Sequence, residues 1–585
     1  MTNEDHQSHS LVPLLPNALT KVTDSLKITN RIIFGEVENL FNEGLGLIIN
    51  KHLNRIEENY CFLLEFDIQY CKKIRFKKFA NTNNEYGKAM ELFSQTISIK
   101  PNFKIAYTYR GIAKVALKDF EGAIDDCCNA IEIDPNYFYT YFIRGFTKRE
   151  LKDLEGAIAD YSKAIEIDPN FANAYYNRGV AKQDLKDLEG AIADYCKAIE
   201  IDQNNDNAYN NRGIAKKDLN DFEGAIADYC KAIEIDPNYA NAYYNRGIAK
   251  QDLKDLEGAI ADYSKAIEID PNYANAYYNR GIAKKDLNDF EGAIADYSKA
   301  IEIDPNYAKS YYNRGVTKRK LKDLEGAIAD YSKAIEIDPN NAKSYNNRGV
   351  AKSKLKDLEG AITDYSKAIE IDSNDASYFC NRGNAKRELK DLEGAISDYS
   401  KAIEIGPNDA FYFYIRGYAK ADLKDLEGAI ADYSKAIEID PNYTAAYNNR
   451  GVIKRELKDL EGAIVDFDKA IEIDPNNATS YNNRGIAKRE LKDFEGAIDD
   501  YCKTIEIDPN YTNAYNNRGN AKVDLKDLEG AIADYSKAIE IDPNYAICYN
   551  NRRTARSQIG DIDGAKSDEL KYNQIIKKNG DGSNL

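Results

Sequence analysis

Histidine is scarce in this sequence, and none lies beyond residue 52. The three histidines are His6, His9 and His52. The remainder also lacks a paired-cysteine spacing and a recognisable nucleophile motif. Metal centres and most catalytic constellations depend on these residue types. We therefore predict that the protein is not an enzyme and has no metal site and no cofactor.

Long apolar runs and a secretory signal are also missing. The first ten residues, MTNEDHQSHS, are polar and acidic, and the apolar run LVPLL that follows is short and interrupted by proline. No stretch approaches the roughly 20 apolar residues that a membrane-spanning helix needs. We expect a cytoplasmic protein without membrane contact. Secretion by a route that needs no signal peptide would leave no mark in this sequence.

Basic side chains are outnumbered, with 80 Lys and Arg against 97 Asp and Glu, for a net charge of -17. Nucleic-acid binding needs clustered cations, so we predict no nucleic-acid partner. The run KKIRFKK, from Lys72 to Lys78, is a local exception. It is interpreted as a solvated helix face, with an anionic contact as the alternative.

Cysteine is present in an odd number, nine, which does not favour a full set of disulfides. Cys196, Cys230 and Cys502 each occupy a position that is serine in most copies of a repeated sequence. We interpret them as small-residue substitutions in a reducing compartment.

Proline is infrequent, and its placement reveals the organisation of the chain. Twelve of the fourteen prolines, from Pro101 to Pro543, lie in one 34-residue register that skips only Gln203 and Ser373. A period of this length is typical of an array of helical hairpins. We expect each of these prolines in the turn between the second helix of one repeat and the first helix of the next, because Asp-Pro-Asn favours a turn.

The repeat that begins at Ala240 shows the pattern for one hairpin. Its second helix is predicted to start after Asp255 as the N-cap and to stop at Asp270, which precedes a proline. The apolar residues of that helix fall on one stripe: Leu256, Ala259, Ile260, Tyr263, Ala266 and Ile267. Helices this short are marginal alone, so stacking of successive hairpins must supply the stability.

The first helix is predicted to span about residues 241–253. Ala242, Tyr243, Gly247, Ala249 and Leu253 are expected to point inward. Glycine costs about 1 kcal/mol of helix propensity against alanine, so close packing of the two helices is the expected reason for Gly247.

The spacing of Tyr243, Gly247, Ala259, Tyr263 and Pro271 resembles the tetratricopeptide repeat. The resemblance implies an all-α fold, a right-handed superhelical α-solenoid of 34-residue helix-turn-helix repeats. In that family the first helices line a concave groove that binds peptides or proteins, and the fold is not catalytic. We assign 1–69 to an N-terminal helical and partly disordered region, 70–103 to a degenerate first repeat, 104–545 to thirteen full repeats, 546–579 to a degenerate capping repeat and 580–585 to a polar tail.

An arginine precedes the glycine in nearly every repeat, as in AYYNRG. Fourteen arginines, from Arg110 to Arg552, each stand 16 residues before an aspartate. In the degenerate first repeat both positions are apolar, Phe76 and Leu92. This pattern predicts a charge contact across the hairpin. The pairs of the central repeats are Arg246 with Asp262 and Arg280 with Asp296; a ligand-binding row of arginines is the alternative.

The residue before the arginine is asparagine in two runs, and the family resemblance places this position in the groove. Such a row resembles the asparagine ladder of the nucleocytoplasmic glycosyltransferase that modifies Ser and Thr, and an amide can bind the main chain of an extended peptide. The alternative is recent duplication without function. The predicted peptide-binding run is Asn177, Asn211, Asn245, Asn279, Asn313, Asn347 and Asn381; the second is Asn449, Asn483, Asn517 and Asn551.

We assign four aromatic residues to the same predicted peptide site. Tyr244 and Tyr278 each precede an asparagine of the ladder, and Phe411 and Tyr414 belong to AFYFYIRGY, where Ile415 replaces the asparagine. Ile415 is expected on or near the groove with them. Replacing Asn245, Asn279 and Asn313 by alanine is expected to weaken binding and to leave the thermal midpoint nearly unchanged.

A second family site is incomplete here. Cochaperone repeats hold a carboxylate tail with lysines and asparagines at fixed positions. Lys309 and Lys343 match one lysine position, but the other holds mainly Tyr or Asn, and a companion asparagine position is mostly Ile or Val, as at Ile248. Binding of heat-shock chaperone tails is therefore disfavoured.

The most direct functional hypothesis is a protein-interaction scaffold that binds an extended peptide or protein segment in the groove. The alternative is an array that targets or regulates a small effector domain within residues 1–69. A third hypothesis is self-association through the ends of the array.

Overall fold

The structure, a computed structural model, describes residues 82–580, which form helices joined by short turns and contain no strand. The described part divides after Pro305 into two compact units. The N-terminal region 1–69, the basic run 72–78, the start of the degenerate first repeat and residues 581–585 lie outside the described residues. The effector-domain hypothesis therefore stays a prediction.

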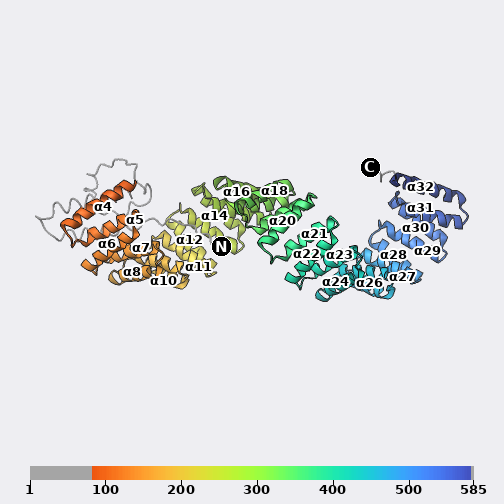
Figure 1. Ribbon diagram of the computed structural model, residues 1–585, viewed down its shortest axis with the longest axis horizontal. Coiled ribbons are helices and arrows are strands. Elements are labelled where there is room, and N and C mark those ends of the chain that lie inside the picture. The colour runs from red at the N-terminus through yellow and green to blue at the C-terminus, as the bar shows by residue number, and fades with distance from the viewer. Residues whose placement is uncertain (1–81, 581–585) are drawn as a thin grey trace. The chain divides into compact units, whose positions relative to one another are not determined.

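The first unit contains thirteen of the helices that the structure describes (Figure 1). They are α4 (Thr82–Ile99), α5 (Lys104–Ala116), α6 (Phe120–Ile133), α7 (Phe138–Glu150), α8 (Leu154–Ile167), α9 (Ala172–Asp184), α10 (Leu188–Ile201), α11 (Asp206–Asp218), α12 (Phe222–Ile235), α13 (Ala240–Asp252), α14 (Leu256–Ile269), α15 (Ala274–Asp286) and α16 (Phe290–Ile303).

The second unit contains the remaining described helices. They are α17 (Ala308–Lys320), α18 (Leu324–Ile337), α19 (Ala342–Lys354), α20 (Leu358–Ile371), α21 (Ala376–Glu388), α22 (Leu392–Ile405), α23 (Ala410–Asp422), α24 (Leu426–Ile439), α25 (Thr444–Glu456), α26 (Leu460–Ile473), α27 (Ala478–Glu490), α28 (Phe494–Ile507), α29 (Thr512–Asp524), α30 (Leu528–Ile541), α31 (Ala546–Gln558) and α32 (Ile562–Gly580).

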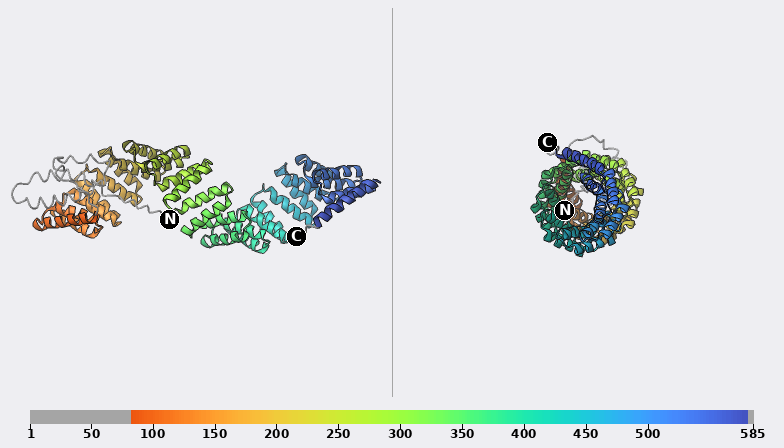
Figure 2. Two further views of the ribbon diagram at one scale, coloured as in Figure 1. Left: turned by 90° about the horizontal axis from the view of Figure 1, so that it is seen from above. Right: turned by 90° about the vertical axis from the view of Figure 1, so that its right-hand side faces the viewer.

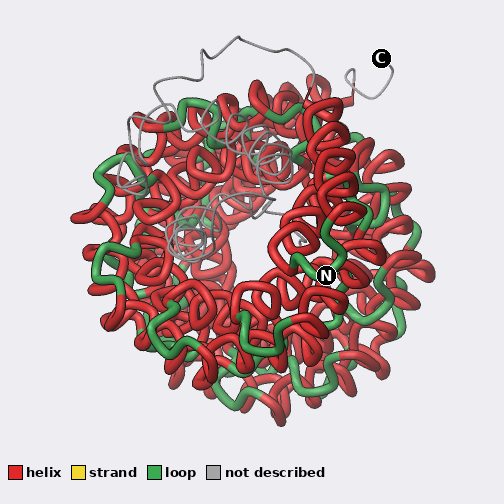
Figure 3. Tube along the Cα trace, turned by 90° about the vertical axis from the view of Figure 1, so that its left-hand side faces the viewer, coloured by secondary structure: helices red, strands yellow, loops and turns green. Residues whose placement is uncertain are grey.

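From α5 onward the helices alternate as the first and second helix of a hairpin. Within each unit, neighbouring hairpins lie side by side in chain order, as the colours in the left view of Figure 2 show, and turns connect the helices (Figure 3). Pro237 and Pro271 lie in the turns between hairpins, as their register predicts. The all-α fold of repeated helical hairpins is confirmed.

Local capping explains where the second helix begins. The Asp255 side chain accepts a hydrogen bond from the backbone N–H of Gly258, at 3.0 Å between Oδ1 and N. It is therefore the N-cap that the sequence predicts. At the other end, Asp270 Oδ1 accepts the N–H of Asn272 at 3.0 Å, which shapes the Asp-Pro-Asn turn.

Leu253, in the turn inside the hairpin, does not lie where the sequence predicts. This side chain was expected to point inward, but it is 46% exposed. The first helix ends at Asp252, and Lys254 then takes a left-handed conformation with φ 66°. This reversal of the chain turns Leu253 away from the core.

The core confirms close packing at Gly247. A Cβ atom placed there would lie 2.6 Å from Cε1 of Tyr263, so no larger residue fits without movement. The contact is with the tyrosine ring of the second helix, and both Tyr263 and Ala259 are fully buried. Between hairpins, Ala266 and Ile267 pack with Ala276 of the next repeat, which is the stacking that short helices require.

Candidate functional site

An arginine and an aspartate join the two helices of each hairpin. Arg246 donates from Nε and Nη2 to Oδ2 and Oδ1 of Asp262, at 2.9 and 2.6 Å. Lys250 Nζ lies 2.8 Å from the same carboxylate, and Asp262 is only 4% exposed. This is the contact that the 16-residue spacing predicts. All fourteen arginines make it, including Arg280 with Asp296.

The arginine also contacts the preceding hairpin. Arg246 Nη1 donates to Cys230 Sγ of α12 at 3.1 Å. On its own helix, the guanidinium carbon of Arg246 lies 5.4 Å from the ring centre of Tyr243. In the next repeat, Ser264 accepts the equivalent bond from Arg280 at 3.0 Å. The hydrogen bond to Asp262 raises the pKa of Arg246. Because all three nitrogens of Arg246 are engaged within the protein, the structure favours the structural role over a ligand-binding row.

The asparagine position has a structural role that the sequence reasoning missed. Asn245 Nδ2 donates to Oδ1 of Asn210 at 3.0 Å, and Asn279 Nδ2 donates to the hydroxyl of Tyr244 at 2.9 Å. The acceptor stands 35 residues earlier, on the first helix of the preceding repeat. The same bond joins Asn211 to Tyr176, Asn347 to Tyr312, Asn381 to Asn346, Asn449 to Tyr414, Asn483 to Asn448, Asn517 to Asn482 and Asn551 to Asn516.

Two exceptions show how this bond depends on its neighbour. For Asn177 the residue 35 positions earlier is Phe142, which has no acceptor, and Asn177 donates instead to the carbonyl of Asn173 at 2.9 Å. At Ile415 the earlier residue is Cys380, and both are 6% exposed in one apolar cluster. The sequence contains a signal for this bond: an asparagine of the ladder stands 35 residues after an asparagine or a tyrosine that can accept it.

These bonds correct one expectation about the ladder. Alanine at Asn245 and Asn279 would remove bonds between repeats, so the thermal midpoint should fall. Asn313 donates to the carbonyl of Lys309 at 3.1 Å. One such bond does not exhaust a primary amide, which has two N–H groups and an acceptor oxygen. Because Asn245, Asn279 and Asn347 are partly exposed, peptide binding by the ladder stays a proposal.

The two predicted site tyrosines of the first unit are largely part of the packing. The Tyr244 ring lies 5.9 Å from that of Tyr263 and 4.9 Å from that of Tyr273, measured between centroids. The Tyr278 ring lies 6.0 Å from that of Tyr297. Both side chains are partly buried.

The most exposed aromatic side chains of the predicted site lie on α23. Phe411 is 44% exposed, and Tyr418, which the sequence reasoning did not assign, is 40% exposed. Tyr414 lies between them, and its hydroxyl accepts a bond from Asn449 at 3.3 Å. We call Phe411, Tyr414 and Tyr418 the aromatic stripe. Tyr418 could have been assigned from the sequence, because it stands seven residues after Phe411 and so lies on the same helix face.

Ile415 does not belong to this surface, contrary to expectation. It packs with Cys380, Ala395, Tyr399 and Ala419 in a buried cluster. The side chain that replaces the asparagine therefore joins the repeats by apolar contact.

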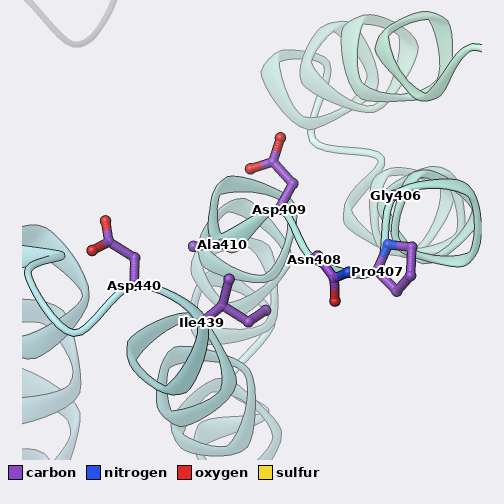
Figure 4. A pocket seen from close by; sticks show the side chains of 7 residues that line it. All are labelled: Gly406, Pro407, Asn408, Asp409, Ala410, Ile439 and Asp440. Carbon is purple, nitrogen blue, oxygen red and sulfur yellow. The ribbon is translucent and has the colours of Figure 1, made fainter.

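A depression in the surface of the second unit lies beside α23 (Figure 4). Its lining is Gly406, Pro407, Asn408, Asp409, Ala410, Ile439 and Asp440. Gly406 stands where most repeats have aspartate, and a Cβ atom there would lie 3.1 Å from Cε2 of Tyr412. Gly406 thus makes room for Tyr412, and none of the predicted site residues lines the depression.

Family models of this repeat match most of the chain. Those described as TPR repeat match 145–186, 184–219, 215–254, 251–287, 283–321, 417–454 and 487–525. Those described as tetratricopeptide repeat match 308–341, 342–375, 376–409, 444–477, 512–545 and 467–499. The chain belongs to the tetratricopeptide repeat (TPR) family. At this general level it is a TPR scaffold for protein interaction, of a family that is typically not enzymatic.

Several solved structures are similar to parts of this TPR chain. MamA is 29% identical, with 28% of this chain and 94% of MamA covered at a TM-score of 0.27. YrrB, described as a TPR protein with an unusual peptide-binding site, is 26% identical, with 31% and 92% covered at a TM-score of 0.28. The APC/C hetero-tetramer Cut9-Hcn1 is 16% identical, with 81% and 94% covered at a TM-score of 0.33. No curated protein sequence matches the chain.

Two features are absent from the described part of the chain. Between residues 82 and 580, no helix combines the length and apolar character that crossing a bilayer requires. The same residues contain no group of three or more His, Cys, Asp or Glu side chains placed to hold a metal ion. The absence of a cofactor stays a prediction.

Proposed function

We propose that this TPR chain binds an extended protein segment along its first helices, with the aromatic stripe of α23 as an apolar anchor. The observation that carries the proposal is the exposure of Phe411 and Tyr418 on one helix. In α13 the equivalent positions hold Asn241 and Ile248. Large exposed aromatic side chains are unfavourable in water and are typical of binding anchors.

The spacing of the stripe suits a single anchoring surface. Phe411, Tyr414 and Tyr418 stand at i, i+3 and i+7, so they share one face of α23. The span from Phe411 to Tyr418 is about 10 Å along the helix axis. A leucine, phenylalanine or similar side chain of a partner could lie across it.

Neighbouring residues hold the middle of the stripe in place. The Tyr414 ring lies 5.9 Å from that of Tyr433 and 5.0 Å from that of Tyr443. Its hydroxyl is fixed by Asn449. A surface whose side chains are already ordered loses less entropy on binding.

The partly exposed amides are proposed to bind the main chain of the same segment. Asn381 and Asn449 lie on α21 and α25, the first helices on either side of α23. An amide can donate to a peptide carbonyl and accept from a peptide N–H without selecting a side chain. In this proposal the amides contribute general affinity and the stripe contributes selectivity.

The test compares two variants of the full chain against peptides selected from a display library on the unmodified chain. Phe411→Asn with Tyr418→Ile introduces the residues that α13 has at these positions. We expect the selected peptides to bind this variant about tenfold more weakly or worse, measured by fluorescence anisotropy.

The matched control removes an exposed apolar side chain elsewhere. Val465→Ala acts on Val465 of the second helix α26, which is 64% exposed, and should leave affinity unchanged. Equal affinity for the stripe variant and the unmodified chain would contradict the anchor.

A further inference from the structure

Two neighbouring first helices end in lysine, where most of the other first helices end in an acidic residue. The last residue of the first helix is acidic in most repeats: Glu150, Asp184, Asp218, Asp252, Asp286, Glu388, Asp422, Glu456, Glu490 and Asp524. In α17 and α19 it is Lys320 and Lys354. Among the described first helices, only these two have lysine there. The net charge of -17 conceals this local reversal.

The same two helices also gain cations near their beginning. Their second residues are Lys309 and Lys343, where α13 and α15 have Asn241 and Asn275. Arg319 adds a further cation, and neither α17 nor α19 contains an acidic residue. We call Lys309, Arg319, Lys320, Lys343 and Lys354 the basic patch.

Helix geometry places the four lysines of the patch on one surface. Residues 309 and 320 are eleven apart, which is three helical turns, so their side chains leave the helix in nearly the same direction. The same holds for 343 and 354 on α19. The helices α17 and α19 contact each other, and Asn347 Nδ2 donates to the Tyr312 hydroxyl at 2.9 Å between them. Equivalent residues of the two helices are therefore neighbours.

The patch is distinct from the cations of the framework. Arg314 and Lys318 bind Asp330, while Arg348 and Lys352 bind Asp364. In contrast, Lys309, Lys343 and Lys354 are exposed on the surface. Arg319 is partly buried, and its Nε has no hydrogen-bond partner among the described residues. An unsatisfied donor of this kind is costly unless a ligand or water completes it.

We propose that the basic patch receives an acidic, extended segment of a partner protein, an inference that rests on the proposed function. Charge complementarity selects the occupant, since five cations on two helices favour several carboxylates in one stretch. The cations are spread over two repeats, so the segment does not need to end there. Nucleic acid is a poorer match, because α21, the next first helix of the same unit, ends in Glu388.

The patch and the aromatic stripe together define a partner sequence. Both lie in the second unit, and α21 is the one first helix between α19 and α23. With neighbouring helices about 10 Å apart, α19 and α23 are separated by about 20 Å. An extended chain spans that distance in about six residues. We therefore expect an acidic run separated by about six residues from a large apolar side chain.

The experiment uses the full chain and fluorescein-labelled synthetic peptides. One peptide has a glutamate block, a Gly-Ser spacer and a phenylalanine; in its twin, glutamine replaces glutamate. We expect the glutamate peptide to bind at least tenfold more tightly than its twin, and addition of salt to reduce this difference. The variant Lys320→Asp with Lys354→Asp should lower affinity for the glutamate peptide about tenfold or more.

The chain offers a matched control for charge. Lys333→Ala with Lys367→Ala removes two exposed lysines of the second helices α18 and α20, which pair with Glu336 and Glu370. This control should bind like the unmodified chain. The introduced aspartates occur at the same position in other repeats, so the fold should tolerate them; circular dichroism checks this.

Three results would overturn the inference: equal binding of the glutamine twin, unchanged affinity of the lysine-to-aspartate variant, or tighter binding of a single-stranded oligonucleotide. The display-selected peptides distinguish failure of this inference from failure of the proposed function. If they bind and depend on Phe411 and Tyr418, while the glutamate peptide does not bind, only the acidic specificity fails. If no peptide depends on either surface, both proposals fail.

Discussion

The second helices and the first helices of this protein differ in how much they vary. The second helices α8, α14, α18, α24 and α30 all have the sequence LEGAIADYSKAIEI. The first helices α13, α17 and α23 read ANAYYNRGIAKQD, AKSYYNRGVTKRK and AFYFYIRGYAKAD. They share the arginine, the glycine and the lysine three residues after the glycine. They differ at exposed positions such as Phe411, and also at the position of the buried Ile415.

This difference separates framework from surface. Arg246 contacts the partner helix and the preceding repeat, and Gly247 contacts the partner helix; they recur because each copy meets the same neighbours. Residues at the positions of Phe411 and Lys320 lie on the exposed side of the first helix, and the side chain there differs from copy to copy. Specificity for a partner is therefore expected in the first helices and stability in the shared residues.

The largest expected effect breaks the framework at Arg246. Arg246→Ala leaves the buried Asp262 with Lys250 alone, so we expect a loss of about 2 to 3 kcal/mol in free energy of unfolding. Urea denaturation followed by circular dichroism measures it. The control Lys265→Ala removes the exposed pair with Glu268 and should leave the free energy of unfolding nearly unchanged. Equal losses in the two variants would refute a framework role.

Gly247→Ala should cost about 1 to 3 kcal/mol, because the new Cβ atom would overlap the Tyr263 ring. The same substitution at Gly87 in α4 meets no atom of residues 82–580 within 4 Å. There it should stabilise the helix by about 0.5 to 1 kcal/mol. Denaturation curves with the same sign for both variants would show that helix propensity, and not packing, determines this position.

Asn245 lies at the border between framework and surface. Asn245→Ala should cost about 0.5 to 1.5 kcal/mol through loss of the bond to Asn210. The chain itself offers a replacement pair, the Cys380 and Ile415 contact. The double variant Asn210→Cys with Asn245→Ile should be more stable than the sum of its single variants predicts, in a double-mutant cycle. Strict additivity would mean that the two side chains do not depend on each other.

The smallest expected effect concerns the turn of the hairpin. Lys254 has φ 66°, whereas the equivalent residue of the last hairpin is Gly560 with φ 86°. Lys254→Gly should stabilise by up to about 1 kcal/mol, since glycine adopts this conformation without a Cβ penalty. Gly560→Lys should have the opposite sign in the same melting experiment. A loss of stability from Lys254→Gly would contradict this account.

The sequence by itself determined the repeating hairpin, its turns and the arginine–aspartate contact. These depend on local spacing, because a 34-residue period, an N-cap such as Asp255 and a proline after Asp270 act within one repeat. The arginine–aspartate pair could also be predicted, since both members change together in the degenerate first repeat.

Only the tertiary structure decided which side chains face a neighbour and which face solvent. The bond of Asn245 to Asn210, the burial of Ile415 and the exposure of Leu253 and Tyr418 all depend on how one helix meets the next. A helical pattern gives the direction of a side chain from its own axis, but burial also depends on the helix beside it. For that reason the framework followed from the repeat, and the candidate binding surface required the packing of neighbouring repeats.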